Sequence, residues 1–189
     1  MQPLGSSNNY FNSQLPHPAT VPGELIELTT GLGEWEQESY ASVTLHGVAV
    51  EPLVYEGEEP IVIVDGQDLP IVWGPPSTPG RSVLYLELNI DQHGNTPVKL
   101  FCNLPDTGSG SIPASLVSQL INFGVSGFPS IRVSRQTVDS TIMPDGGCME
   151  FKVSSARDGN VRVDGFVPCF SDDDCPETQT CNTALEICQ

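Results

Sequence analysis

The stretch RSVLYLELNI, residues 81–90, alternates apolar and polar side chains along its length. Its three leucines and Ile90 fall on one face, whereas Tyr85 and the residues in phase with it fall on the other. A period of two residues predicts a long strand that buries one face in a core. We take this strand as the reference for the rest of the fold.

Further stretches with the same period lie on both sides of it, separated by Pro and Gly. They cover residues 25–29, 41–46, 50–55, 61–64, 71–73, 98–102, 130–138, 148–154 and 161–167. Roughly seven or more short strands with turn residues between them are typical of antiparallel sandwiches. The sequence therefore predicts a mainly β protein with an antiparallel β-sandwich as its body.

One segment, residues 113–123, has a different period. Leu116, Leu120 and Phe123 fall at helical spacing. A Ser before Pro113 is a candidate N-cap, and Gly124 is a typical stop. We expect one short amphipathic helix packed across an edge or end of the sandwich.

The composition excludes several classes of protein. The 24 acidic residues outnumber the 7 basic ones, which gives a formal net charge of −17. Because no Lys or Arg precedes Arg81, the chain lacks the basic face that nucleic acid requires. No apolar stretch is long enough to cross a membrane. The start of the chain is not a signal peptide, so we expect any leader or anchor to lie outside these residues.

The cysteines indicate an oxidising compartment. Four of the six lie in the tail CFSDDDCPETQTCNTALEICQ, residues 169–189. A segment this short cannot build a core, and it lacks the close Cys pairs and His residues of zinc sites. We expect Cys169, Cys175, Cys181 and Cys188 to form two disulfides among themselves, with all three connectivities open.

The other two cysteines, Cys102 and Cys148, then remain as partners, and we expect them to form a third disulfide. The organisation that follows has three parts: a disordered N-terminal linker at 1–20, a β-sandwich domain at 21–168 and a Cys-rich disulfide knob at 169–189. The expected location is extracellular, at the cell surface or in the periplasm.

Two resemblances add to this interpretation. The stretch LPIVWGPPSTPGRSVLYLEL, residues 69–88, resembles immunoglobulin-like and fibronectin-III-like sandwiches of secreted bacterial surface proteins. The tail, with Asp and Pro beside its cysteines, resembles small Cys-rich modules such as the Dickkopf-type region. Both resemblances imply a protein that displays, binds or spaces things at a surface, and neither implies catalytic residues.

Two short motifs overlap near the middle of the chain. Asp106-Thr107-Gly108-Ser109 matches the aspartic-protease motif, whose chemistry needs two carboxylates sharing a proton. Only one copy is present, and we interpret it as a loop in which Asp106 makes local turn hydrogen bonds. Leu104-Pro105-Asp106-Thr107-Gly108 matches a sortase signal, but the hydrophobic stretch and basic tail that such a signal requires do not follow it.

The remaining candidates are weaker. Residues 172–174, all Asp, and Glu177 offer the oxygen ligands that calcium prefers, but the EF-hand register is absent, which favours a solvated acidic turn. His17, His46 and His93 are too scattered to suggest a catalytic triad. We assign no catalytic, cofactor-binding or metal-binding residue and expect no cofactor.

Three functions stay open. The first is a non-enzymatic extracellular or cell-surface module for adhesion, ligand binding or envelope structure, with a protein or a glycan as partner. The second is a carbohydrate- or calcium-dependent binding domain. The third is a secreted aspartic-protease-like hydrolase that uses the loop Asp106-Thr107-Gly108-Ser109.

Overall fold

The computed structural model describes residues 14, 19–30, 33–35, 38–40, 42–90, 98–127, 129–143 and 146–189. Most of the predicted N-terminal linker, together with His17 and His93, lies outside the described residues. The described chain is mainly β with one α-helix, as the sequence predicts. The strands are β1 (Leu25–Thr30), β2 (Gly33–Trp35), β3 (Glu38–Tyr40), β4 (Val43–Val48), β5 (Ile61–Ile63), β6 (Leu69–Val72), β7 (Val83–Asn89), β8 (Lys99–Pro105), β9 (Ser109–Ile112), β10 (Ser130–Ile142), β11 (Cys148–Val163), β12 (Cys181–Asn182) and β13 (Ile187–Cys188).

The main sheet has five strands in the order β5-β11-β10-β7-β8. The reference strand β7 lies inside it, paired with β10 on one side and β8 on the other. Every pair in this sheet is antiparallel except one, because β5 runs parallel to the end of β11. This parallel contact is the one departure of the main sheet from the predicted antiparallel pairing. The parallel pairing places Ile61 and Ile63 in the core beside Val161 and Val163.

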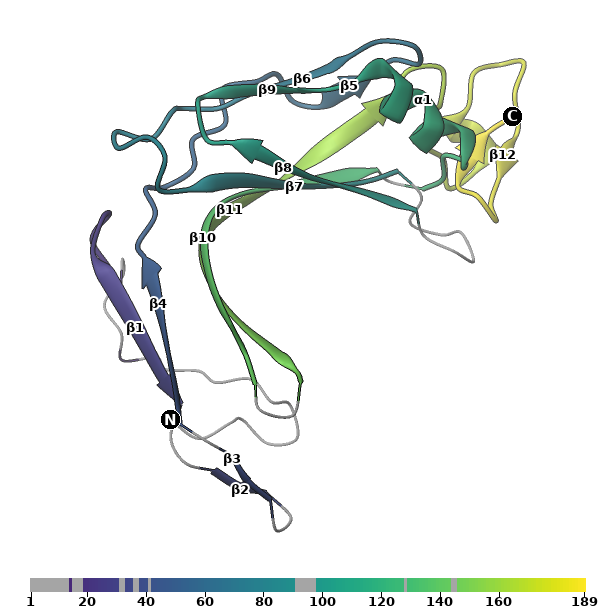
Figure 1. Cartoon of the computed structure of the whole chain (residues 1–189). Helices are drawn as coiled ribbons and strands as arrows, with labels where there is room; N and C mark the ends of the chain where they lie inside the picture. The colour runs from purple at the N-terminus through teal and green to yellow at the C-terminus, as the bar shows by residue number, and fades with distance from the viewer. Residues whose placement is uncertain are drawn as a thin grey trace.

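A second layer covers one face of this sheet. The antiparallel pair β6–β9 stacks above β7 and β8, and helix α1 (Ala114–Asn122) lies next to it (Figure 1). Ile71, Trp73 and Ile112 are buried in the same core as the leucines of β7. This layering is compatible with the predicted sandwich.

The helix forms where its period predicts, but its buried face shares only Leu120 with the predicted one. Val117 and Leu120 are buried, whereas Leu116 is 39% exposed and Phe123 is 69% exposed. The predicted Ser cap is also wrong, since Pro113 occupies the N-cap position and makes no side-chain cap. The carboxylate of Asp68 instead accepts the Ala114 N–H at 2.7 Å, so the cap comes from a distant loop.

The longest elements form a curved hairpin. Strands β10 and β11 leave the core and bend strongly, and β1 and β4 lie against the convex side of the bend (Figure 1). There the Val48 N–H donates to Thr137 Oγ1 at 3.2 Å, and the His46 N–H donates to Asp139 Oδ2 at 2.8 Å. Two predicted strands, 148–154 and 161–167, merge into β11, which ends at Val163. The predicted strand at 50–55 reduces to a single bridge between Tyr55 and Trp73.

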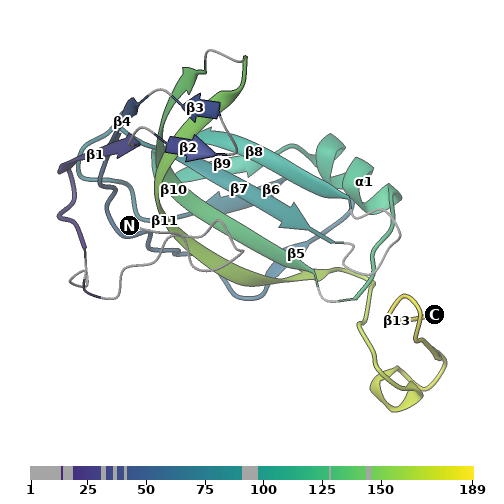
Figure 2. The ribbon, with the colours of Figure 1, turned by 90° about the horizontal axis from the view of Figure 1, so that it is seen from below.

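The tail forms two disulfides, Cys169–Cys181 and Cys175–Cys188, so its four cysteines pair among themselves as predicted. Figure 2 shows this segment projecting beyond the end of the sheet. The hydrogen bond from the Gly127 N–H to the Leu185 carbonyl, 2.8 Å, connects it to the loop that follows α1.

The predicted Cys102–Cys148 bridge is wrong, because both thiols are free. The register of the sheet explains this. Cys102 lies opposite Leu86, and Leu86 lies opposite Val133 near the start of β10. Cys148 lies opposite Ile142 at the far end of β10, which is about 30 Å of strand away.

These two thiols should differ in reactivity. Cys148 is exposed, whereas Cys102 is half-buried, and burial raises the pKa of the Cys102 thiol above its ordinary value. Because the thiolate is the reactive form, N-ethylmaleimide at pH 8 should label Cys148 about tenfold faster or more. Peptide mass spectrometry over time would measure both rates. Equal rates would contradict the burial of Cys102.

Candidate functional site

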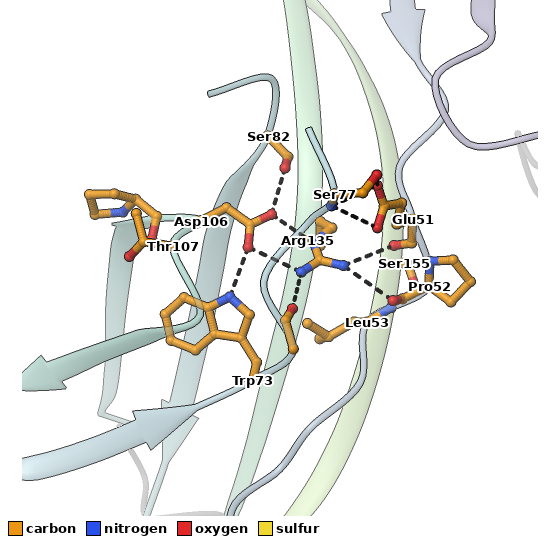
Figure 3. Close-up of polar contacts among 12 residues, drawn as sticks. Glu51, Pro52, Leu53, Trp73, Ser77, Ser82, Asp106, Thr107, Arg135 and Ser155 are labelled. Atoms are coloured by element: carbon orange, nitrogen blue, oxygen red, sulfur yellow. Dashed lines mark hydrogen bonds and ion pairs between the residues drawn. The ribbon is translucent and has the colours of Figure 1, made fainter. Parts of the chain in front are cut away.

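The aspartate of the protease-like motif is fully buried in the structure. Asp106 follows the last residue of β8, and its carboxylate accepts hydrogen bonds from Trp73 Nε1 at 2.7 Å and Ser82 Oγ at 2.5 Å (Figure 3). It also pairs with Arg135 Nε at 2.7 Å. The expectation of local turn hydrogen bonds for Asp106 is therefore wrong, because its partners come from other segments of the chain.

Arg135 is the residue that the sequence analysis missed. Its side chain is only 2% exposed, and its guanidinium also donates to the carbonyls of Pro52 and Gly74. A buried charge is tolerated only when it is paired and hydrogen-bonded, and both conditions hold here. The alternation of the strand could have identified it, because Arg135 falls on the same face of β10 as the apolar residues Ile131 and Val133.

The electrostatics of this site favour the charged form of Asp106. Burial by itself would raise the pKa of Asp106. The hydrogen bonds from Arg135, Ser82 and Trp73, and the charge of Arg135, outweigh burial and hold the pKa below its ordinary value. Asp106 thus joins the end of β8, the end of β6 and the middle of β10.

The glycine of the same motif also has a packing reason. Gly108 adopts a φ of +100°, which L side chains rarely adopt. A Cβ there would also lie 3.2 Å from Pro75 Cβ and 3.3 Å from the Trp73 carbonyl oxygen. The Trp73 N–H donates to the Gly108 carbonyl at 2.9 Å. Packing against the Trp73 segment therefore accounts for the Asp and the Gly of the motif.

Two acidic residues of the tail, Asp172 and Asp174, accept hydrogen bonds from the backbone. Asp174 Oδ2 accepts the N–H groups of Phe170 and Ser171, and these bonds lower the pKa of Asp174. Asp172 Oδ1 accepts the Cys181 N–H at 2.7 Å. Asp173 and Glu177 are exposed. Among the described residues, the one cluster with metal-ligand spacing is Cys169, Cys175 and Cys181, whose sulfurs are in disulfides.

His46, the one predicted histidine that the structure describes, lies on the β1–β4 pair. Its Nε2 is 3.6 Å from a carboxylate oxygen of Glu27 on the facing strand, and both side chains are exposed. This contact is a cross-strand surface pair.

A surface suited to binding lies on the opposite side of the main sheet from the core. We define the outer face as the side chains of β7, β8, β10 and β11 that alternate with the core residues, which place Tyr85 opposite Asn103 and Ser134. The bend of the β10–β11 hairpin makes this face concave, and Figure 2 looks onto it from below. On this face Ser134 and Gln136 are buried, although they alternate with the core residues of β10.

The outer face combines an aromatic pair with ion pairs. The rings of Tyr85 and Phe101 stack with centroids 6.1 Å apart, and Phe101 is 56% exposed. Next to them, Lys99 Nζ contacts Glu87 at 2.6 Å. A hollow of about 360 Å³ adjoins this row. Its polar lining residues are Glu87, Asn89, Lys99, Ser130, Arg132 and Asp158.

The charge of the outer face differs from that of the whole chain. Four of the seven basic residues are in its phase: Lys99, Arg132, Lys152 and Arg162. Three of these pair with an acidic residue of the same face, at distances of 2.6–3.0 Å. This face is therefore close to neutral, and the net charge of −17 resides on the rest of the molecule.

Comparison with protein-family models and with curated proteins finds no match to this chain. In the described part of the chain, no helix has the length and apolar character needed to span a lipid bilayer. The candidate site therefore rests on its own geometry.

Proposed function

We propose that this chain is a non-enzymatic extracellular or cell-surface binding module whose outer face binds a neutral glycan. The stacked pair of half-buried Tyr85 and exposed Phe101 on a concave sheet carries the proposal. Sugar rings present apolar C–H faces that pack on aromatic rings, and their hydroxyls hydrogen-bond to charged and polar groups at the edges. Lys99, Glu87 and Asn89 offer such groups beside the rings.

Other observations support this proposal. Binding sites commonly combine aromatic side chains with a few placed polar groups in a hollow, as the outer face does. The two tail disulfides are typical of an oxidising compartment. The buried pairing of Asp106 with Arg135 favours a structural use of the protease-like motif. With this function we also propose the immunoglobulin-like class for the body and the Dickkopf-type class for the tail.

Removing the aromatic pair should weaken glycan binding. We expect Tyr85→Ala and Phe101→Ala each to raise the Kd about tenfold, since about 1.4 kcal/mol corresponds to a factor of ten and lies within the range for aromatic contacts. The probes are cellohexaose, chitohexaose and maltohexaose, followed by NMR shift perturbation and calorimetric titration. The matched control is Phe123→Ala, which removes an exposed ring at the C-cap of α1 and should leave binding unchanged.

Two results would contradict this function. One is that none of the three oligosaccharides perturbs resonances of β7, β8 or β10. The other is that binding persists unchanged when both rings are removed.

A further inference from the structure

Among the described residues, the main sheet ends at β8, and the far edge of this strand is unpaired. In the part of the chain that the structure describes, β8 pairs with β7 on one side and with no strand on the other. Its seven residues include one charge, Lys99, at the very start. Natural edge strands are commonly protected by charges, bulges or short length, because an open edge templates pairing with another chain. The middle of β8 has none of these protections.

The core side of this edge is incompletely covered. Leu100, Cys102 and Leu104 pack against the core but stay partly exposed, unlike the leucines of β7 that they face. On the other side of the strand, Phe101 is 56% exposed. Another strand beside β8 would bury apolar surface on both sides of the sheet and would satisfy the free backbone groups.

The sequence of β8 points to the identity of that strand. Residues 100–104 read Leu-Phe-Cys-Asn-Leu, with a leucine at equal distance on either side of Cys102. We infer that β8 pairs antiparallel with β8 of a second copy of this chain, with the two-fold axis passing beside Cys102. In this register Leu100 faces the partner's Leu104, and Phe101 faces the partner's Asn103.

Charge and length are consistent with a self-limiting dimer. Lys99 faces the partner's Pro105, so the two lysines lie at opposite ends of the paired strands. Pro105 has no N–H to donate, which ends the pairing there. An isologous contact uses the same edge of both copies and therefore closes at two. Because seven residues per copy form a small interface, we expect a transient dimer with a Kd of about 1–100 µM.

The net charge of −17 per chain opposes association, so salt should strengthen the dimer. The inference does not rest on the proposed function. In the dimer the two outer faces would be continuous, because rotation about an axis normal to the sheet keeps each face on its own side.

A pair of charge variants tests the register. Phe101 and Asn103 are exposed, so Lys or Glu there perturbs the fold little. Phe101→Lys with Asn103→Lys places two lysine pairs across the axis, whereas Phe101→Lys with Asn103→Glu places two Lys–Glu pairs there. Sedimentation equilibrium of the full chain with oxidised tail, at 1–200 µM, should give Kd values at least about tenfold apart, with the Lys–Glu variant tighter. For the unmodified chain, raising NaCl from 20 to 300 mM should lower the Kd.

Disulfide trapping gives a second measure of the same register. Diamide takes up the two electrons and two protons of a pair of thiols and joins the sulfurs. In a Cys148→Ser background, Cys102 should form a covalent dimer with its partner copy, since residues on the axis have Cα atoms about 4.5–5.5 Å apart. In a Cys102→Ser background, Cys148 should give none above the level of random collision.

The inference is overturned if the unmodified chain stays monomeric at 200 µM in 300 mM NaCl. It is also overturned if the two charge variants dimerise equally, or if Cys148 crosslinks as fast as Cys102. These readouts are independent of sugar binding, so a failure of the glycan proposal is recognised separately.

Discussion

Replacing Asp106 by Asn is expected to lower the free energy of unfolding by about 3–5 kcal/mol. Arg135 would remain buried with its counter-charge removed, and a buried uncompensated charge is among the costliest defects that a substitution can produce. The variant keeps the size of the side chain, so the loss reports charge and hydrogen bonding. Urea unfolding followed by circular dichroism and tryptophan fluorescence measures it, with Trp73 as a reporter beside the pair.

Two controls separate this effect from general damage. Asp158→Asn removes an ion pair of similar geometry with Arg132, but one whose partners are 53% and 72% exposed, so it should cost about 1 kcal/mol or less. Asp106→Leu combined with Arg135→Met removes both charges and should restore much of the loss. An Asp106→Asn variant as stable as the unmodified chain would contradict the role of this pair.

The same pair predicts acid sensitivity. The pKa of Asp106 is lower in the folded protein than in the unfolded chain, where it is about 3.9. A group of this kind contributes its stabilisation fully above the unfolded pKa and loses it as the pH falls toward the folded pKa. Between pH 5 and pH 2 the unmodified chain should therefore lose more stability than Asp106→Asn. Parallel pH–stability curves would contradict this.

Removing a tail disulfide is expected to unfold the tail while the sheets remain folded. Replacing Cys175 and Cys188 by Ser deletes a bridge whose cysteines are 13 residues apart, which should cost about 3 kcal/mol. Within residues 169–189, only Cys169 and Ile187 are buried, so the segment has almost no core to compensate.

Amide hydrogen exchange would show which part of the chain unfolds. The amides of Thr180 and Gln189, which bond to each other's carbonyls, should lose protection, whereas those of β7 and β10 should keep it. The matched control is Cys148→Ser, which removes a free thiol and should change neither region. Unchanged protection in the tail of the double Ser variant would show that other contacts hold it.

Properties that depend only on residues close together in the chain could be predicted from the sequence. The alternation in residues 81–90 predicts β7 and the face that it buries, because side chains of a strand point alternately to its two sides. The period in residues 113–123 predicts α1. The self-contained disulfides of the tail follow from a segment too short to build a core.

Only part of the candidate binding site could be predicted from the sequence. The phase of β7 places Tyr85 on the face opposite the core, but the pairing of Tyr85 with Phe101 depends on the register between β7 and β8. The concavity depends on the bend of the β10–β11 hairpin, whose curvature no local pattern encodes.

Which residues contact each other across long separations in the sequence was decided by the tertiary structure alone. Trp73, Asp106 and Arg135 are far apart in the chain and meet because the ends of β6 and β8 lie beside the middle of β10 in one core. The parallel contact of β5 with β11, and the distance that keeps Cys102 from Cys148, follow from the same global register. Local periodicity determines which face of an element is apolar, whereas the register and layering of whole sheets determine which residue that face meets.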